Sequence, residues 1–356
     1  MTTRPTEWRR AQWPVLDRVA AERLADGVLA GVRVALHRDL DTGVLADVLE
    51  GVGARVRVVD PGPAVEADLL LDHGGALTMP TLASLEGGAA SLGVVEVAAT
   101  GAAWARRLEA YDALPIPVVA VWESACVGDL VGPPGVAQTT LQELLRVTNQ
   151  RLPGARVAIL GYDAVARRLA DVVRGMGGRP MFAVRESLPA LRAHLAGHEV
   201  AEPATAVAGA AFVVVTGHER VVPSLLATLR TSAVLVSAVG PDRIDLAGLD
   251  EVAAGPADEI RPGLTRYRLR DDRTVFVVAG GAPVALDPDL SAGTLDLVFA
   301  TAVLACRVVL AHGLPGGVHP VPTDVEEAVA AATLAVAGVP GWAGSGDGEA
   351  EGSDCV

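Results

Sequence analysis

The chain has 356 residues, of which 51% are hydrophobic, which is enough for about two domains with substantial cores. Its formal net charge is −14 and it contains no basic run, which excludes nucleic acid and anionic membrane surfaces as expected partners. All 29 basic residues are arginine, so Schiff-base chemistry and a lysine phosphate clamp are excluded as well.

Cysteine usage and the N-terminal residues indicate a cytoplasmic protein. Cys126, Cys306 and Cys355 are odd in number and far apart, which fits a reduced chain better than a disulfide framework. They do not have zinc-like spacing, and we predict no metal site. Residues 1–10 are charged and polar, unlike a secretory signal. The most apolar helix expected, 295–310, carries a charge and looks too short to span a bilayer.

In chain order, the first part of the sequence predicts an α/β domain. A helical pattern covers 6–30, and the next elements are a strand at 32–36 and a helix at 42–51. Further strands are expected at 56–59, 67–71 and 118–121. A Gly/Pro cluster at 132–135 then opens a helix over 136–149.

The second part predicts another α/β unit. A βα unit is expected from a strand at 155–161 and a helix at 164–176. A second strand follows at 181–184. The elements expected after it are strands at 212–215 and 233–236, paired strands at 267–269 and 275–278, and helices at 290–312 and 324–337.

The turn at 161–166 resembles a dinucleotide-binding turn that has lost its glycines. The pattern G-x-G-x-x-G lets a diphosphate approach the backbone. Here Gly161 keeps the first position, but Asp163 and Ala166 occupy the second and third. Asp163 is a good N-cap for the following helix, and it also places a carboxylate where a diphosphate would lie. Val184 stands where the acidic ribose-binding residue is expected.

Several segments, in this order, resemble adenosylhomocysteinase, the NAD-dependent enzyme that splits S-adenosylhomocysteine into adenosine and homocysteine. The resemblance reaches from Glu7 to about Gly338. The shared order makes the fold resemblance specific while saying little about activity. The matching segments are 35–37, 41–45, 71–78, 146–149, 157–162, 214–217, 267–269, 318–322 and 326–329.

This resemblance implies an α/β fold that joins a Rossmann-like, doubly wound parallel sheet of the cofactor type to an α/β substrate-type domain. The implied substrate-type domain is 1–122 plus 290–340, and the Rossmann-like domain is 123–289. Residues 341–356 are Gly-rich and acidic, and we expect a disordered tail. A homo-oligomer, dimer or tetramer, is also implied, with a hetero-oligomer containing a true adenosylhomocysteinase as an extension.

The resemblance assigns four residues to substrate binding. His37 matches the adenosine-side histidine of the family, and Asp41 and Thr42 match a pair that contacts the adenine. Glu96 keeps the first of two paired glutamates, whereas the second is Val97. A nucleoside or adenosyl compound is therefore the expected small-molecule partner.

Most of the catalytic positions are substituted. His73 falls on the family's catalytic aspartate, and Val127 on the lysine that acts at the ribose 3′-hydroxyl. A small gap brings Asp129 to a further aspartate position, so His73 and Asp129 are the catalytic candidates. Since losing one catalytic group costs about 10² to 10⁴ in rate, hydrolysis of S-adenosylhomocysteine is not expected.

Four residues are cofactor-binding candidates. Gly161 and Asp163 belong to the dinucleotide turn, Thr100 falls on the NAD-holding threonines of the family, and Thr216 lies in a matched segment at a strand end. His218 follows at the same edge. We predict no tightly bound cofactor. NAD is expected to bind only if the protein is an active enzyme.

Each candidate also has a structural interpretation. His37 is explained equally well as a strand-end structural residue, and His73 as a turn residue. Glu96, Glu123 and Asp129 are explained as solvated loop charges.

Three functions therefore remain open. The first is an adenosylhomocysteinase-like paralogue without hydrolysis or tight NAD binding, acting as a nucleoside-binding or partner subunit. The second is an active enzyme of altered chemistry on a nucleoside, such as a dehydratase, epimerase or oxidoreductase. The third is a purely structural or interaction protein.

Overall fold

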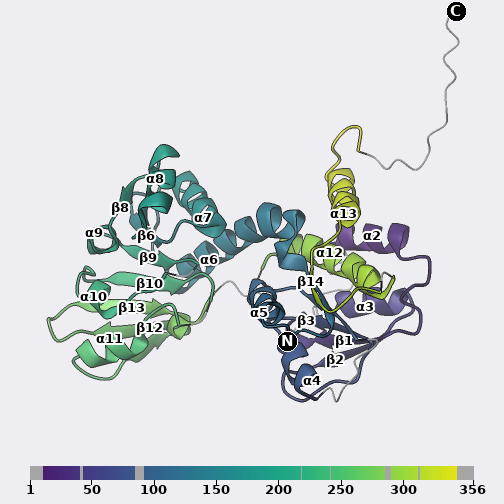
Figure 1. Ribbon diagram of the computed structural model, residues 1–356. Coiled ribbons are helices and arrows are strands. Elements are labelled where there is room, and N and C mark those ends of the chain that lie inside the picture. The colour runs from purple at the N-terminus through teal and green to yellow at the C-terminus, as the bar shows by residue number, and fades with distance from the viewer. Residues whose placement is uncertain are drawn as a thin grey trace, which may run out of the picture. The chain divides into compact units, whose positions relative to one another are not determined.

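The computed structural model describes residues 11–40, 43–84, 92–217, 219–240, 242–284, 290–311 and 313–342. Backbone contacts divide the chain into two units (Figure 1). Unit 1 is Met1–Val131 with Ala292–Val356, and unit 2 is Gly132–Ser291. Most of the expected acidic tail, from residue 343 onward, lies outside the described residues.

Unit 1 is built on a parallel sheet with the strand order β2-β1-β3-β4-β5-β14. Every residue of β3 and β4 is buried, as expected for strands covered on both faces by helices. The strands are β1 Arg33–His37, β2 Arg55–Val59, β3 Leu69–Asp72, β4 Gly93–Glu96, β5 Pro117–Ala120 and β14 Gly317–His319.

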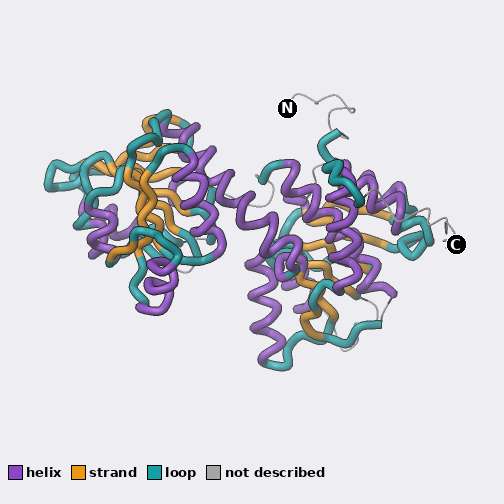
Figure 2. Tube along the Cα trace, turned by 90° about the horizontal axis from the view of Figure 1, so that it is seen from above, coloured by secondary structure: helices purple, strands orange, loops and turns teal. Residues whose placement is uncertain are grey.

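Helices surround this sheet, and Figure 2 shows the strands of each unit between helices. Trp13, just before α2, stacks on Phe299 of α12 with ring centroids 5.3 Å apart, which joins the two ends of the chain within unit 1. The elements are α2 Pro14–Arg23, η1 Arg38–Leu40, α3 Leu45–Gly51, α4 Thr78–Ser84, α5 Ala99–Ala110, η2 Val121–Glu123, η3 Ala125–Val131, α12 Ala292–Ala311 and α13 Thr323–Val336.

Helix α12 is longer than the apolar stretch 295–310 expected from the sequence. Its span Ala292–Leu310 is long and apolar enough to cross a membrane by length and composition, so the expectation that this helix is too short to span a bilayer was wrong. However, 78% of its most apolar window is buried inside the fold, as in the core helix of a water-soluble domain. Its Asp296 carboxylate accepts hydrogen bonds from the Val15 and Leu16 amides (3.0 and 2.8 Å), so it caps the start of α2.

Unit 2 contains an eight-stranded sheet in the order β11-β12-β13-β10-β9-β6-β7-β8. The strands from β13 to β8 run parallel, whereas β11 and β12 pair in antiparallel fashion at one edge. The strands are β6 Arg156–Leu160, β7 Arg179–Ala183, β8 Val200–Ala201, β9 Phe212–Val215, β10 Ala233–Ser237, β11 Asp258–Arg261, β12 Leu264–Arg268 and β13 Thr274–Val278.

The order from β8 through β6 to β13 is that of a Rossmann fold, in which the chain reverses its direction of sheet growth between β6 and β9. The predicted doubly wound α/β fold is thus confirmed. The helical elements of unit 2 are α6 Gly132–Thr148, α7 Ala164–Gly175, α8 Ser187–Leu195, α9 Pro203–Ala208, α10 Pro223–Leu226, α11 Leu246–Val252 and η4 Ala279–Gly281.

Candidate functional site

The chemistry-bearing residues of unit 1 gather at the carboxyl edge of its sheet. His37 ends β1, Asp72 ends β3 and Glu96 ends β4. Sheet growth reverses between β1 and β3, and ligands of open α/β sheets bind in the crevice beyond such a switch point. The fold therefore brings the predicted residues His37, His73 and Glu96 to one edge.

Glu96 holds the loop that carries His73. Its side chain is buried, with 2% exposed, and accepts hydrogen bonds from the amides of Gly74, Gly75 and Ala98 at 2.9, 2.9 and 2.8 Å. Both glycines have positive φ, which other residues rarely adopt. Burial, helped by the nearby Asp72 charge, raises the pKa of Glu96 to about 8. Glu96 is therefore not a solvated loop charge.

Asp72 stabilises the same loop through a second set of hydrogen bonds. Its buried carboxylate accepts hydrogen bonds from the amides of His73, Leu77 and Thr78 and from the Thr78 hydroxyl at 2.6 Å. These bonds close the turn 73–77 and cap α4. Asp72 is not among the site residues expected from the sequence, although an aspartate directly after three leucines of a buried strand is a usable signal.

His37 and His73 face this edge as a pair. Their ring centroids are 5.7 Å apart, with the rings tilted by 45°. His37 is buried (1% exposed), and its Nδ1 accepts a hydrogen bond from the Asp39 amide at 3.1 Å. Burial lowers the pKa of His37, opposed by the Asp72 and Asp39 charges, so the ring is neutral at physiological pH. His73 is half-buried.

The remaining unit 1 candidates are placed differently. Thr100 is exposed in the first turn of α5, and its hydroxyl lies 3.5 Å from where a Cβ on Gly74 would be, so it sits beside the loop. Asp129 is exposed in the π-helix η3. Glu123 forms an ion pair with Arg106 at 2.8 Å. Asp41 and Thr42 lie outside the described residues.

The cofactor candidates of unit 2 meet at its own switch point. Gly161 follows β6 with φ of 112°, and a Cβ there would lie 2.7 Å from the Thr216 hydroxyl. The buried Thr216 hydroxyl donates to the Leu160 carbonyl at 3.0 Å. Gly161, Asp163 and Thr216 therefore lie at the edge where a Rossmann fold binds its ligand. His218 lies outside the described residues.

Asp163 is the N-cap of α7, as its residue type predicted. Its Oδ1 accepts a hydrogen bond from the Ala166 amide at 2.7 Å. A Cβ on Gly217 would lie 2.5 Å from Oδ2, so the carboxylate also fills the space beside that glycine. A diphosphate uses helix-terminal amides and is repelled by a neighbouring negative charge. The turn as it stands does not fit a bound diphosphate.

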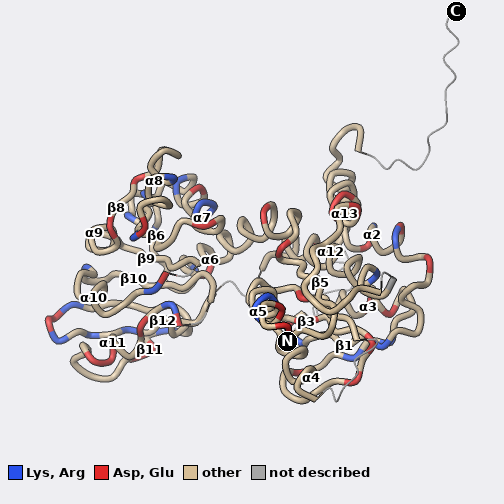
Figure 3. Tube along the Cα trace, in the orientation of Figure 1, with Lys and Arg blue, Asp and Glu red and all other residues tan. Residues whose placement is uncertain are grey.

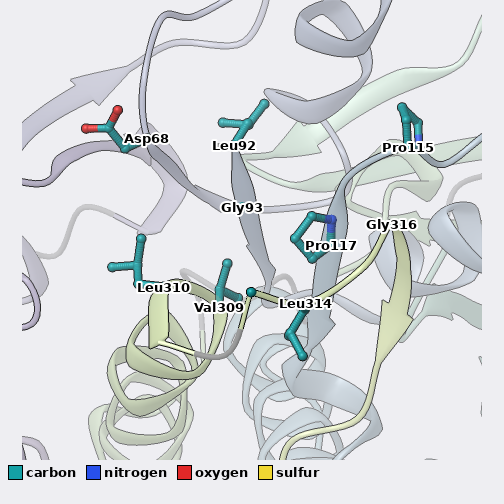
Figure 4. A pocket seen from close by; sticks show the side chains of 10 residues that line it. Asp68, Leu92, Gly93, Pro115, Pro117, Val309, Leu310, Leu314 and Gly316 are labelled. Carbon is teal, nitrogen blue, oxygen red and sulfur yellow. The ribbon is translucent and has the colours of Figure 1, made fainter. Parts of the chain in front are cut away.

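Two cavities lie away from these residues. One, of about 510 Å³, opens beside the amino ends of β4 and β5 and the end of α12 (Figure 4). Asp68 on its wall is paired with Arg33 at 2.7 Å. The other, of about 540 Å³, lies in unit 2 beside Glu143 and Arg146, which form an ion pair. No predicted site residue lines either cavity.

The surface charge is mixed. Acidic and basic residues are interspersed along the chain in both units (Figure 3). Many arginines are paired with carboxylates, including Arg106 with Glu109 and Glu123 and Arg266 with Asp258.

These features define a two-unit α/β protein whose second unit has the Rossmann order of a dinucleotide-binding domain. The family model described as S-adenosyl-L-homocysteine hydrolase, NAD binding domain, matches residues 135–289. Adenosylhomocysteinase of Thermotoga maritima is 27% identical over 383 residues, covering 93% of this chain and 94% of the relative. Residues 135–289 thus match the NAD-binding domain of the adenosylhomocysteinase family, and the similarity to its members extends over most of the chain, which confirms the resemblance seen in the sequence.

Further relatives extend the comparison. Adenosylhomocysteinase of Aeropyrum pernix is 27% identical and covers 94% of this chain and 91% of the relative. S-inosyl-L-homocysteine hydrolase of Methanopyrus kandleri is 25% identical over 94% of this chain and 90% of its own. Among solved structures, a dipicolinate synthase from Bacillus halodurans has a TM-score of 0.49 and 14% identity, covering 80% of this chain and 99% of that chain.

Proposed function

We propose that this chain binds a nucleoside or adenosyl compound at the carboxyl edge of the unit 1 sheet, without hydrolysing S-adenosylhomocysteine and without holding NAD tightly. It acts alone or as a partner subunit. The observation that carries the proposal is the Asp163 carboxylate at the start of α7, bonded to the Ala166 amide. That carboxylate competes with a diphosphate both for the amide and through its charge.

The absence of lysine supports the loss of hydrolysis. The full sequence contains none, so no position of the chain can supply the amine that acts on the ribose 3′-hydroxyl in the family's reaction. Asp72 and Glu96, the buried acids at this edge, are each bonded to several backbone amides of the loop. Neither is available as a solvent-exposed base.

Ligand binding at unit 1 is supported by what remains there. His37 and His73 form a polar pair at the switch point, where a ligand of an open sheet is expected. His37 is substrate-binding in this proposal and His73 lies beside the reacting part of the ligand. Asp41, Thr42 and Glu96 remain predicted substrate contacts, and Asp129, Thr100 and Thr216 remain predicted site residues.

The first prediction tests the dinucleotide turn. Asp163→Gly frees the Ala166 amide and removes the charge, and we expect NAD affinity to rise about tenfold or more. Asp163→Asn keeps a capping side chain without the charge, and its NAD affinity should lie between those of the wild type and of Asp163→Gly. The measurement is calorimetric titration of the purified protein with NAD, after assay of its denatured supernatant for NAD that copurified.

Asp245→Gly is the matched control, because Asp245 caps α11 of the same unit by accepting from the Gly248 amide at 2.9 Å. It removes an N-cap of the same kind away from the turn and should leave NAD affinity unchanged. Stoichiometric NAD in the wild-type supernatant would overturn the proposal. Titration with adenosine, inosine and S-adenosylhomocysteine completes the test, and binding of none of them would also contradict it.

A second candidate function is an enzyme of altered chemistry on a nucleoside, such as a dehydratase, epimerase or oxidoreductase, using NAD if it is a redox reaction. The neutral His37 beside His73 favours it, since a neutral imidazole can accept a proton. Mass spectrometry of the nucleosides after the same incubations, with and without NAD, distinguishes a changed product from binding alone.

Assembly and location are further parts of the proposal. We propose a homo-oligomer, dimer or tetramer, and a hetero-oligomer with a true adenosylhomocysteinase where the two are produced together. Among the described residues, Cys126 and Cys306 are buried and form no disulfide, which supports a reducing compartment and hence the cytoplasm.

A further inference from the structure

We propose that His37, Asp39 and His73 bind a divalent transition-metal ion of the zinc or cobalt type at the carboxyl edge of the unit 1 sheet. The three side chains each offer one ligand atom, and these atoms lie within 4.8 Å of one another. No metal site is expected from the sequence, and metal binding by these residues does not depend on the proposed nucleoside ligand.

The donor set selects the kind of ion. Two imidazole nitrogens and one carboxylate oxygen suit zinc, cobalt, nickel or ferrous iron, whereas calcium and magnesium prefer oxygen ligands alone. Three protein ligands leave further coordination positions open, as in catalytic rather than structural zinc sites. Water or a polar group of a small molecule can fill them.

His37 is prepared to act as a ligand. A backbone amide can only donate, so the bond from the Asp39 amide to Nδ1 identifies Nδ1 as the unprotonated nitrogen of the neutral ring. The same Nδ1 lies 3.9 Å from the Asp39 carboxylate Oδ2. An ion between these atoms replaces one amide as the partner of the Nδ1 lone pair. Because residue 39 is exposed, water can then satisfy its amide.

His73 is held in place by its loop. Its own amide donates to Asp72 at 2.7 Å, and the two following amides donate to Glu96. Such fixation of a ligand's backbone lowers the entropy lost on metal binding. The third ligand, Asp39, lies in the short turn η1 with a side chain 54% exposed.

The cluster must contract when it binds an ion. Ligand atoms around a tetrahedral zinc lie about 3.3 Å apart, given metal–ligand bonds of about 2.0 to 2.1 Å. Asp39 can make most of this movement because its side chain is largely exposed, whereas His37 is buried and His73 is half-buried. The negative charges of Asp39 and Asp72, which both act on His37, favour a cation at this edge, whereas the Asp60 charge is already paired with Arg38.

The experiment is metal titration of the full chain without a polyhistidine tag, after removal of metals by a chelator. Cobalt binding is followed by its visible absorption, and zinc binding by calorimetry. We expect one ion per chain, and an increase in thermal midpoint with zinc, because an ion that binds only the folded state stabilises it. The tests are made without nucleoside.

His73→Ala and Asp39→Asn should each weaken binding of cobalt and zinc by about tenfold or more. Asp39 is exposed, so its variant tests the site even if the His73 variant folds poorly. His194→Ala removes an exposed histidine of α8 and should leave both affinities unchanged. Wild-type protein that binds neither ion, or binding that is undiminished in both cluster variants, would overturn the inference.

Discussion

Individual residues explain why the two buried acids of unit 1 are structural supports of the loop. Asp72 and Glu96 end adjacent strands and together accept hydrogen bonds from six backbone amides at 73–75, 77–78 and 98. A buried carboxylate is stable only when such donors surround it. The loop is thereby fixed, and it holds the backbone of His73 at this edge of the sheet.

The raised pKa of Glu96 predicts how stability depends on pH. The unfolded chain releases the Glu96 proton near the ordinary pKa of 4.5, whereas the folded chain keeps it until about pH 8. The contribution of Glu96 to the free energy of unfolding is therefore fully present below pH 4.5. It falls as pH rises toward 8, by up to about 1.4 kcal/mol per pH unit. Glu96→Gln removes the titration and should flatten the decrease.

The measurement is the free energy of unfolding by urea between pH 6.5 and 8.5. Burial also raises the pKa of Asp296, to about 6, so most of its titration lies below this window. Equal slopes for wild type and Glu96→Gln would contradict the assignment.

Among the single elements, helix α5 packs directly against the Glu96 side chain that holds the His73 loop. Helix α5 passes so close to Glu96 that a Cβ on Gly101 would lie 2.1 Å from the carboxyl group. A side chain at this position must displace either the helix or the Glu96 carboxyl group that holds the His73 loop. The glycine is therefore required by a close approach within a helix, where it otherwise costs stability.

Gly101→Ala should destabilise the protein by about 1 to 3 kcal/mol, because overpacking outweighs the gain in helix propensity. Gly175→Ala is the matched control. It also replaces a glycine within a helix, α7, but no atom lies within 4 Å of the added carbon, and it should be neutral or stabilise by up to about 1 kcal/mol. Urea unfolding of both variants checks the prediction. A Gly101 variant as stable as wild type would show that α5 adjusts freely.

At the scale of the whole molecule, the two units differ in how the chain builds them. Unit 2 is one continuous segment, Gly132–Ser291. Unit 1 combines both ends of the chain: β14 pairs with β5, and α12 contributes the buried Phe299 that stacks on Trp13. Residues 1–131 alone lack one edge strand and a central core helix.

We therefore predict that residues 132–291 fold as an isolated fragment and that residues 1–131 do not. Circular dichroism during heating should show a cooperative transition for the first fragment alone. Coexpression of 1–131 with 292–356 should restore a protease-resistant complex, because the missing strand and helix are then supplied. A cooperatively folded 1–131 fragment would contradict this account.

Much of the fold could be predicted from the sequence, because buried parallel strands are apolar runs and Asp163 is a recognisable cap. Strand β4, Gly93–Glu96, was missed because its apolar run is only Val94–Val95, between a glycine and a glutamate. Helix α6 begins at Gly132, earlier than expected, because prolines are tolerated in a first helical turn. The site was predicted in part. His37 and His73 were identified, but their approach to Asp39 depends on strand order, which no local pattern contains.

The pairing of Gly317 with Pro117 across the sheet has a consequence for biosynthesis. A ribosome adding about 5 to 20 residues per second needs roughly 10 to 40 s to make the intervening segment. During that interval the open flank of β5 has no neighbour, while unit 2 can already be complete. The nascent chain should then be most prone to aggregation, and most dependent on chaperones, until its final helices emerge.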